Sequence, residues 1–95
     1  MIRMSVLYPK GEGVTFDVDY YRTAHMAIVH RTMGGVVRSE VDQPIDGPYA
    51  GVGHLYFESM ESLQATMGNG STEALDDIPN FTNSQPVIQI SQVLD

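Results

Sequence analysis

The chain has 95 residues, of which 42% are hydrophobic, and this is enough apolar side-chain volume for one packed core and one domain spanning residues 1–95. Five basic and twelve acidic residues give a formal charge of −7, which disfavours binding to nucleic-acid phosphates or anionic lipid. There is no cysteine, so the sequence excludes disulfides, thiolate nucleophiles and iron–sulfur ligation.

The first third of the chain predicts a strand followed by a helix. Residues 2–8 alternate along one apolar face, which is typical of a strand. A helix is predicted from about residue 18 to residue 33, where a pair of glycines ends it. Asp17 takes the N-cap position, and Phe16 and Tyr21 take the two positions of a hydrophobic staple, so this helix start is well specified.

The rest of the chain predicts three strands, one helix and a short helical turn. Residues 36–42 and 49–57 form two strands joined by a turn that is rich in proline. Ser59 caps the second helix, and Ser71 caps a short turn before the last strand at residues 86–94.

The predicted order of elements is β-α-β-β-α-β, which matches the α+β ferredoxin-like split βαβ arrangement. Two helices would cover one face of a four-stranded antiparallel sheet. The other face carries apolar surface that one chain leaves uncovered, so we expect a homodimer that packs sheet against sheet.

The inward side of the first predicted helix carries Tyr21 and His25, whereas Tyr20 points elsewhere. One interpretation of His25 is structural, as a core histidine with a hydrogen-bonded neighbour. The other is chemical, because an imidazole that lines a pocket can act as a general acid or base near neutral pH. The sequence leaves both interpretations open.

Four segments, in this order along the chain, together carry a family resemblance: Phe16-Asp17-x-x-Tyr20-Tyr21-x-x-x-His25-Met26, Gly53-His54-Leu55-Tyr56-Phe57, Asp77-Ile78-Pro79-Asn80-Phe81-Thr82 and Gln85-Pro86-Val87-Ile88-Gln89-Ile90-Ser91. They resemble the EthD family, small proteins named for a gene cluster for ethyl tert-butyl ether degradation. The resemblance implies the dimeric α/β-barrel variant of the ferredoxin-like fold, with a pocket between sheet and helices in each subunit. Related barrels include cofactor-free monooxygenases, muconolactone isomerases and haem-binding proteins. The family's helix histidine corresponds to His25, although Ala27 stands where many relatives have proline.

The barrel suggests further pocket residues from the strands. We expect the face with His54 and Tyr56 to point toward the helices, because Gly51 and Gly53 would then suit close packing at the barrel interior. Tyr8 would add a hydroxyl to the same pocket. The alternative for each tyrosine is a core-filling ring with its hydroxyl at an edge.

These residues predict a catalytic site at His25 and a substrate-binding site at Tyr21, His54, Tyr56 and Tyr8. Such a pocket suits proton transfer on a small hydrophobic or aromatic molecule, as in isomerisation, dehydration, cyclisation or oxygenation, with no cofactor. No metal-binding motif is present, and Asp76-Asp77 is expected to be a solvated helix end. Two alternatives are a non-catalytic binding protein that supports a partner oxidase, and a purely structural dimer.

The N-terminal residues lack the apolar core of a signal peptide. No apolar run approaches the roughly 20 residues that span a bilayer. We therefore expect a cytoplasmic protein that does not bind membranes.

Overall fold

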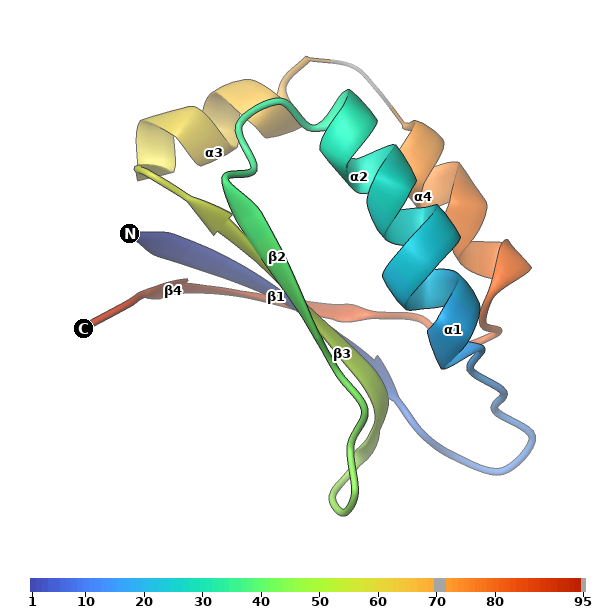
Figure 1. Ribbon diagram of the computed structural model, residues 1–95. Coiled ribbons are helices and arrows are strands. Elements are labelled where there is room, and N and C mark those ends of the chain that lie inside the picture. Colours follow the sequence, from blue (N-terminus) through green and yellow to red (C-terminus); the bar gives the residue numbers. More distant parts are fainter. Residues whose placement is uncertain (70–71, 95) are drawn as a thin grey trace.

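The computed structural model describes residues 1–69 and 72–94 and places a layer of helices on one face of a four-stranded antiparallel sheet (Figure 1). The sheet order is β2-β3-β1-β4, formed by β1 (Ile2–Pro9), β2 (Arg38–Asp42), β3 (Tyr49–Phe57) and β4 (Val87–Gln92). The helices are α1 (Val18–Tyr20), η1 (Tyr21–His25), α2 (Met26–Thr32), α3 (Met60–Met67), α4 (Glu73–Asp77) and η2 (Ile78–Asn80). The predicted α+β ferredoxin-like fold is confirmed, while the predicted cap Ser71 lies outside the described residues. Within the part of the chain described, every helix is too short or too polar to cross a membrane.

The start of the first helix follows the prediction. Asp17 accepts a hydrogen bond from the backbone N–H of Tyr20 at 3.1 Å, and the rings of Phe16 and Tyr21 lie 5.1 Å apart. The cap satisfies one of the N–H groups left free at a helix start, and the ring pair fixes the direction in which the chain enters it.

The middle of this helix contains a π-turn, η1, that the period of 3.6 residues did not predict. Because a π-turn holds more residues than an α-turn, it changes which downstream side chains face the sheet. Met26 and Val29 are buried, whereas Ile28 is only half-buried. Residues four apart come nearly into line, so the rings of Tyr21 and His25 stack at 5.2 Å.

The predicted orientation of β3 is wrong. The register pairs Gly53 with Val6 and His54 with Ser5, so His54 and Tyr56 lie on the sheet face away from the helices. Gly51 and Gly53 lie on the helix face instead. A Cβ atom on Gly53 would overlap the hydroxyl of Tyr21, and the ring of Phe16 crowds Gly51 in the same way. The glycines therefore make room for large rings of the helix.

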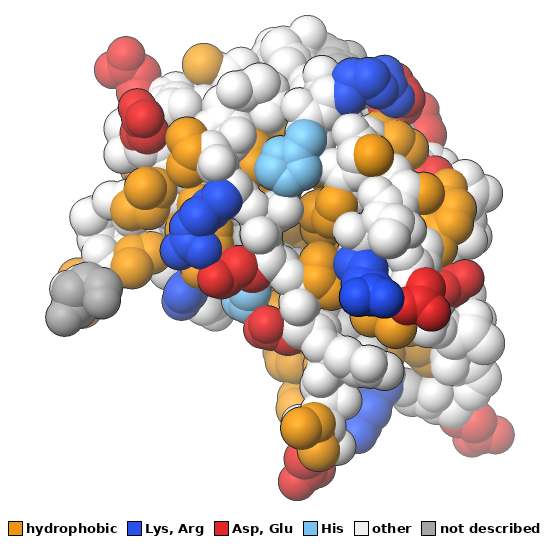
Figure 2. Space-filling model, in the orientation of Figure 1, with side chains coloured by type: hydrophobic (Ala, Val, Ile, Leu, Met, Phe, Trp, Pro, Cys, Tyr) orange, Lys and Arg blue, Asp and Glu red, His pale blue; other side chains and the backbone are white. Residues whose placement is uncertain are grey.

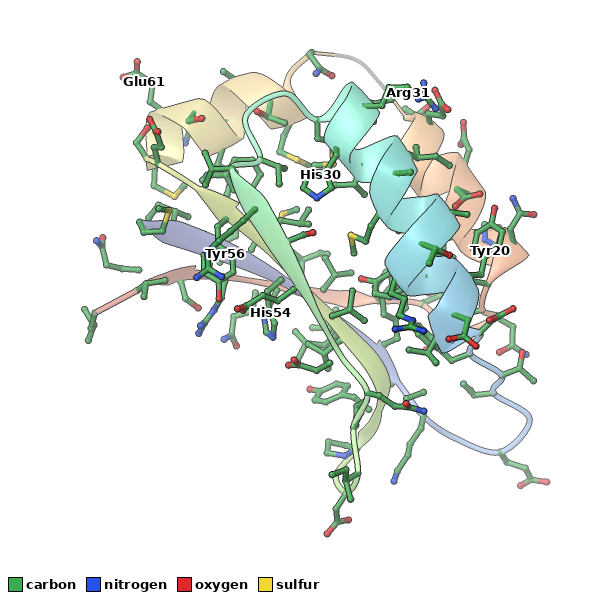
Figure 3. All side chains as sticks on the ribbon, viewed as in Figure 1. Tyr20, His30, Arg31, His54, Tyr56 and Glu61 are labelled. Carbon is green, nitrogen blue, oxygen red and sulfur yellow. The ribbon has the colours of Figure 1, made fainter. Side chains whose placement is uncertain are left out.

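The outer sheet face, opposite the helices, is more polar than we predicted. His54 contacts the Ser5 hydroxyl through Nδ1 at 2.8 Å and the carboxylate of Asp42 through Nε2 at 2.9 Å. Tyr56 donates a hydrogen bond to Glu40 at 2.6 Å. Figure 3 shows the labelled His54 and Tyr56 on the side of the sheet away from α2. Figure 2, by contrast, shows hydrophobic side chains between β2 and the helix that contains α2.

Candidate functional site

A cavity of about 200 Å³ lies between the helices and the sheet. The floor comes from β1 and β3, and the walls come from η1, α2, α3, α4, η2 and β4. Apolar side chains dominate the lining, which consists of Met4, Val6, Tyr8, His25, Val29, Thr32, Met33, Leu55, Thr66, Met67, Asn69, Ala74, Leu75, Ile78, Pro86 and Ile88. A concave apolar pocket with a few polar groups is typical of a small-molecule site.

A second depression, of about 370 Å³, is an open groove on the surface between the loop before α1 and the segment after η2. Its one charged side chain, Asp17, is engaged as the helix cap. Because it is open and His25 does not line it, we place the candidate site in the smaller cavity.

The imidazole of His25 is tied to a buried carboxylate. His25 is 5% exposed, and its Nδ1 lies 2.9 Å from Oδ2 of Asp77, which is 6% exposed. The other oxygen, Oδ1, accepts hydrogen bonds from the hydroxyl of Tyr20 at 2.7 Å and from the side-chain amide of Asn80 at 2.9 Å. The prediction that Asp77 is a solvated helix end is therefore wrong. The 3-10 turn η2, which begins directly after Asp77, brings the Asn80 side chain back to this carboxylate.

This network sets the protonation of the histidine. An ionised carboxylate only accepts hydrogen bonds, so Nδ1 of His25 carries the proton and Nε2 keeps its lone pair. Burial lowers the pKa of His25, and the contact with Asp77 offsets only part of that effect. Burial would raise the pKa of Asp77, but hydrogen bonds from Asn80, Tyr20 and His25 outweigh burial and lower it. At neutral pH the pair is a neutral imidazole beside a carboxylate.

Aromatic rings fix the plane of the imidazole. Tyr21 stacks on His25 with 16° between the planes, and Phe81 meets it edge-on with 4.7 Å between the ring centroids. Burial raises the pKa of Tyr8 to about 12, and a hydrogen bond with Tyr21 lowers it in part. Burial also raises the pKa of Tyr21, and the contact with Tyr8 adds to this increase.

Comparison with solved structures identifies the family. An EthD-like protein from Ralstonia eutropha is 32% identical to this chain, with a TM-score of 0.89 over 99% of this chain and 92% of that one. This chain belongs to the EthD family. An EthD family protein from Bacillus halodurans is 20% identical, with a TM-score of 0.74 over 99% of both chains. The resemblance seen in the four sequence segments is confirmed.

More distant structural neighbours share the fold alone. SnoaB, a cofactor-independent oxygenase from Streptomyces nogalater, is 10% identical, with a TM-score of 0.64 over 99% of this chain and 92% of that one. A scan against protein-family models and a search of curated proteins gave no match. The fold is thus the ferredoxin-like dimeric α/β barrel.

In this EthD protein, the five residues predicted to form the site occupy three different places. His25 and Tyr8 line the cavity. Tyr21 lies behind His25, with its hydroxyl over Gly53, and supports the imidazole rather than lining the cavity. His54 and Tyr56 lie on the outer sheet face.

The residues that the prediction missed are Asp77, Tyr20 and Asn80. Asp77 and Asn80 belong to a segment that carried the family resemblance, and this was the one available signal for them. Among residues 1–69 and 72–94 there is no group of three or more His, Asp or Glu side chains that could hold a metal ion.

The burial of His25 predicts a pH dependence of stability. We expect the folded protein to show a His25 titration midpoint below 6.5, its ordinary value. Between 6.5 and that lower midpoint the unfolded chain binds more protons, so the free energy of unfolding decreases as the pH falls through this window. Histidine ring resonances in NMR would give the midpoint. Urea unfolding of the wild type and of His25→Gln at several pH values would show how much of the pH dependence of the unfolding free energy comes from His25. A midpoint above 6.5 would mean that Asp77 outweighs burial.

Proposed function

We propose that this EthD protein binds a small apolar molecule in the cavity between sheet and helices and moves a proton on it without an added cofactor. The observation that carries the proposal is the placement of His25, whose ring lines the cavity while Nδ1 donates to the buried carboxylate of Asp77. In this arrangement Nε2 is the base, and the carboxylate stabilises the imidazolium that forms.

The supported reaction class is isomerisation through an enol or enolate. A proton leaves a carbon next to a carbonyl, its electron pair enters the carbonyl system, and Nε2 of His25 takes the proton. Tyr8 also lines the cavity, and we assign to its hydroxyl the role of donor to the developing oxyanion. The imidazolium then returns the proton to another carbon of the same molecule, so no electron leaves the ligand and no oxidant is needed.

The test is the conversion of cyclohex-3-enone to the conjugated cyclohex-2-enone, followed by ultraviolet absorbance. Proton removal between the carbonyl and the double bond, followed by return at the far end of the dienolate, is the step proposed for His25. We expect the wild-type protein to accelerate the conversion over buffer. If the probe binds and the rate stays at the buffer value, the protein is a binding protein rather than an isomerase.

The outer sheet face supports a homodimer. No helix of the described residues covers this face in Figure 1, and Leu7 and Val52 are half-buried on it beside the polar groups around His54. In a dimeric α/β barrel two such sheets pack face to face, which would enclose these side chains. Sedimentation equilibrium should give twice the mass of one chain at micromolar concentrations. The mass of one chain there would refute the dimer.

A further inference from the structure

The size of the cavity limits its ligand. An apolar protein cavity of about 150 Å³ is large enough to hold benzene, and pockets for drug-sized ligands measure about 300–1,000 Å³. At about 200 Å³ this cavity is slightly larger than a benzene-sized cavity and smaller than a pocket for a drug-sized ligand. It therefore fits one ring with a small substituent and is too small for fused three-ring molecules.

The charge of the lining limits the ligand further. No Lys, Arg, Asp or Glu occurs among the lining residues of the described chain. Asp77 lies directly behind His25, and His25 is neutral near pH 7 because burial lowers its pKa. An anionic ligand would lose its hydration without gaining a cation, and it would face the carboxylate behind the imidazole. An uncharged ligand avoids both costs.

The distribution of exposure orients the ligand. His25 is 5% exposed and belongs to the buried part of the lining, together with Tyr8 and Val29. Met67, Leu75 and Ile88 line the cavity as well, yet they are 51%, 62% and 51% exposed, and they come from α3, α4 and β4. These three side chains form the mouth. A ligand that enters here keeps its apolar part at the mouth and carries its polar end inward.

We infer that the ligand is an uncharged molecule built on a single ring, with its most acidic C–H or O–H at Nε2 of His25 and its apolar remainder against Leu75 and Ile88. Cyclic ketones, lactones and phenols belong to this class. The inference rests on the proposed function, because it places the reacting proton at His25. It adds the size, the charge and the orientation of the molecule.

Three probes separate these properties in calorimetric titrations of the full chain: p-cresol, with one ring and no charge; 4-methylbenzoate, with one ring and a negative charge; and anthrone, with three rings and no charge. We expect p-cresol to bind at least tenfold more tightly than either of the others. The ring resonances of His25 should shift on p-cresol binding, whereas those of His30, which contacts Ser39 outside the cavity, should not. Equal affinity for 4-methylbenzoate or anthrone, or no binding of p-cresol at millimolar concentration, would overturn the inference.

Two matched variants locate the binding. Ala74 lines the cavity from α4, so Ala74→Phe fills it, whereas Ala65 is exposed on α3 and does not line it. We expect Ala74→Phe to weaken p-cresol binding at least tenfold and Ala65→Phe to leave it unchanged. Equal losses in both variants would place the ligand elsewhere, and the His25 resonance shift decides the question if Ala74→Phe does not fold.

The probes also distinguish the two proposals. Selective p-cresol binding without conversion of cyclohex-3-enone would refute the proposed function and leave the ligand class standing. Conversion of cyclohex-3-enone together with equal binding of 4-methylbenzoate would refute the ligand class alone.

Discussion

Replacing His25 with glutamine is expected to lower the rate of cyclohex-3-enone isomerisation by about 10²–10⁴-fold, the usual contribution of a positioned general base. A glutamine side chain can still donate to Asp77, but its amide does not accept a proton at neutral pH. The cavity keeps its apolar lining, so probe binding should change much less than the rate. The measurement is the initial rate at saturating probe, together with probe affinity from calorimetry.

The control for this variant is His30→Gln. His30 is an exposed histidine of α2 whose Nε2 contacts the Ser39 hydroxyl at 2.8 Å, and it does not line the cavity. The control should keep the wild-type rate. A His25→Gln protein that is folded and retains more than a third of the wild-type rate would show that another group takes the proton.

Replacing Asp77 with asparagine is expected to abolish most of the activity while preserving the shape of the site. Two donors, Tyr20 and Asn80, fix Oδ1 of Asp77 as an acceptor. In the variant the amide oxygen stays with these donors, so the amide N–H₂ faces Nδ1 of His25. The imidazole must then accept at Nδ1 and carry its proton on Nε2, which makes the cavity nitrogen a donor instead of a base.

We therefore expect Asp77→Asn to lose at least tenfold in isomerisation rate, as is usual when the partner that orients a functional histidine is changed. The ring ¹⁵N shifts of His25 should report the change of tautomer, a readout that a merely structural role would leave unmoved. The adjacent Asp76 is exposed and contacts Thr72, so Asp76→Asn is the matched control. Loss of rate with the wild-type tautomer would contradict this assignment.

A different result is expected for stability when Asp77 becomes alanine. The hydroxyl of Tyr20, Nδ1 of His25 and the amide of Asn80 would all lose their acceptor. Because a buried donor without a partner costs about 1–3 kcal/mol, the free energy of unfolding should fall by more than in Asp77→Asn. Urea unfolding of the two variants makes this comparison, and equal losses would show that the carboxylate does not hold the segment in place.

The elements and the helix start were predictable because their signals are local. Asp17 and the ring pair of Phe16 and Tyr21 lie within six consecutive residues, and their geometry follows from the helix itself. Alternation along β1 identified the face that carries Tyr8, because that strand has only one strongly apolar face.

The orientation of β3 was not predictable from its own residues. Both faces of that strand carry aromatic and apolar side chains, so the alternation does not choose between them. The choice follows from a distant contact, since Tyr21 on the helix needs the space that Gly53 leaves. The role of Asp77 is non-local in the same way, because its partner His25 lies 52 residues earlier in the chain.

The π-turn at η1 makes the site sensitive to chain length. Each residue of an α-helix advances about 100° around the axis. Because the π-turn holds one extra residue, regular α-helical winding of the same residues would rotate His25 relative to Asp77, while the cap at Asp17 and the sheet stayed as they are. A substitution that rewinds the turn as regular α-helix would thus separate His25 from its carboxylate, whereas the loss of one exposed residue of the turn, such as Thr23 or Ala24, would keep the helix beyond it in phase.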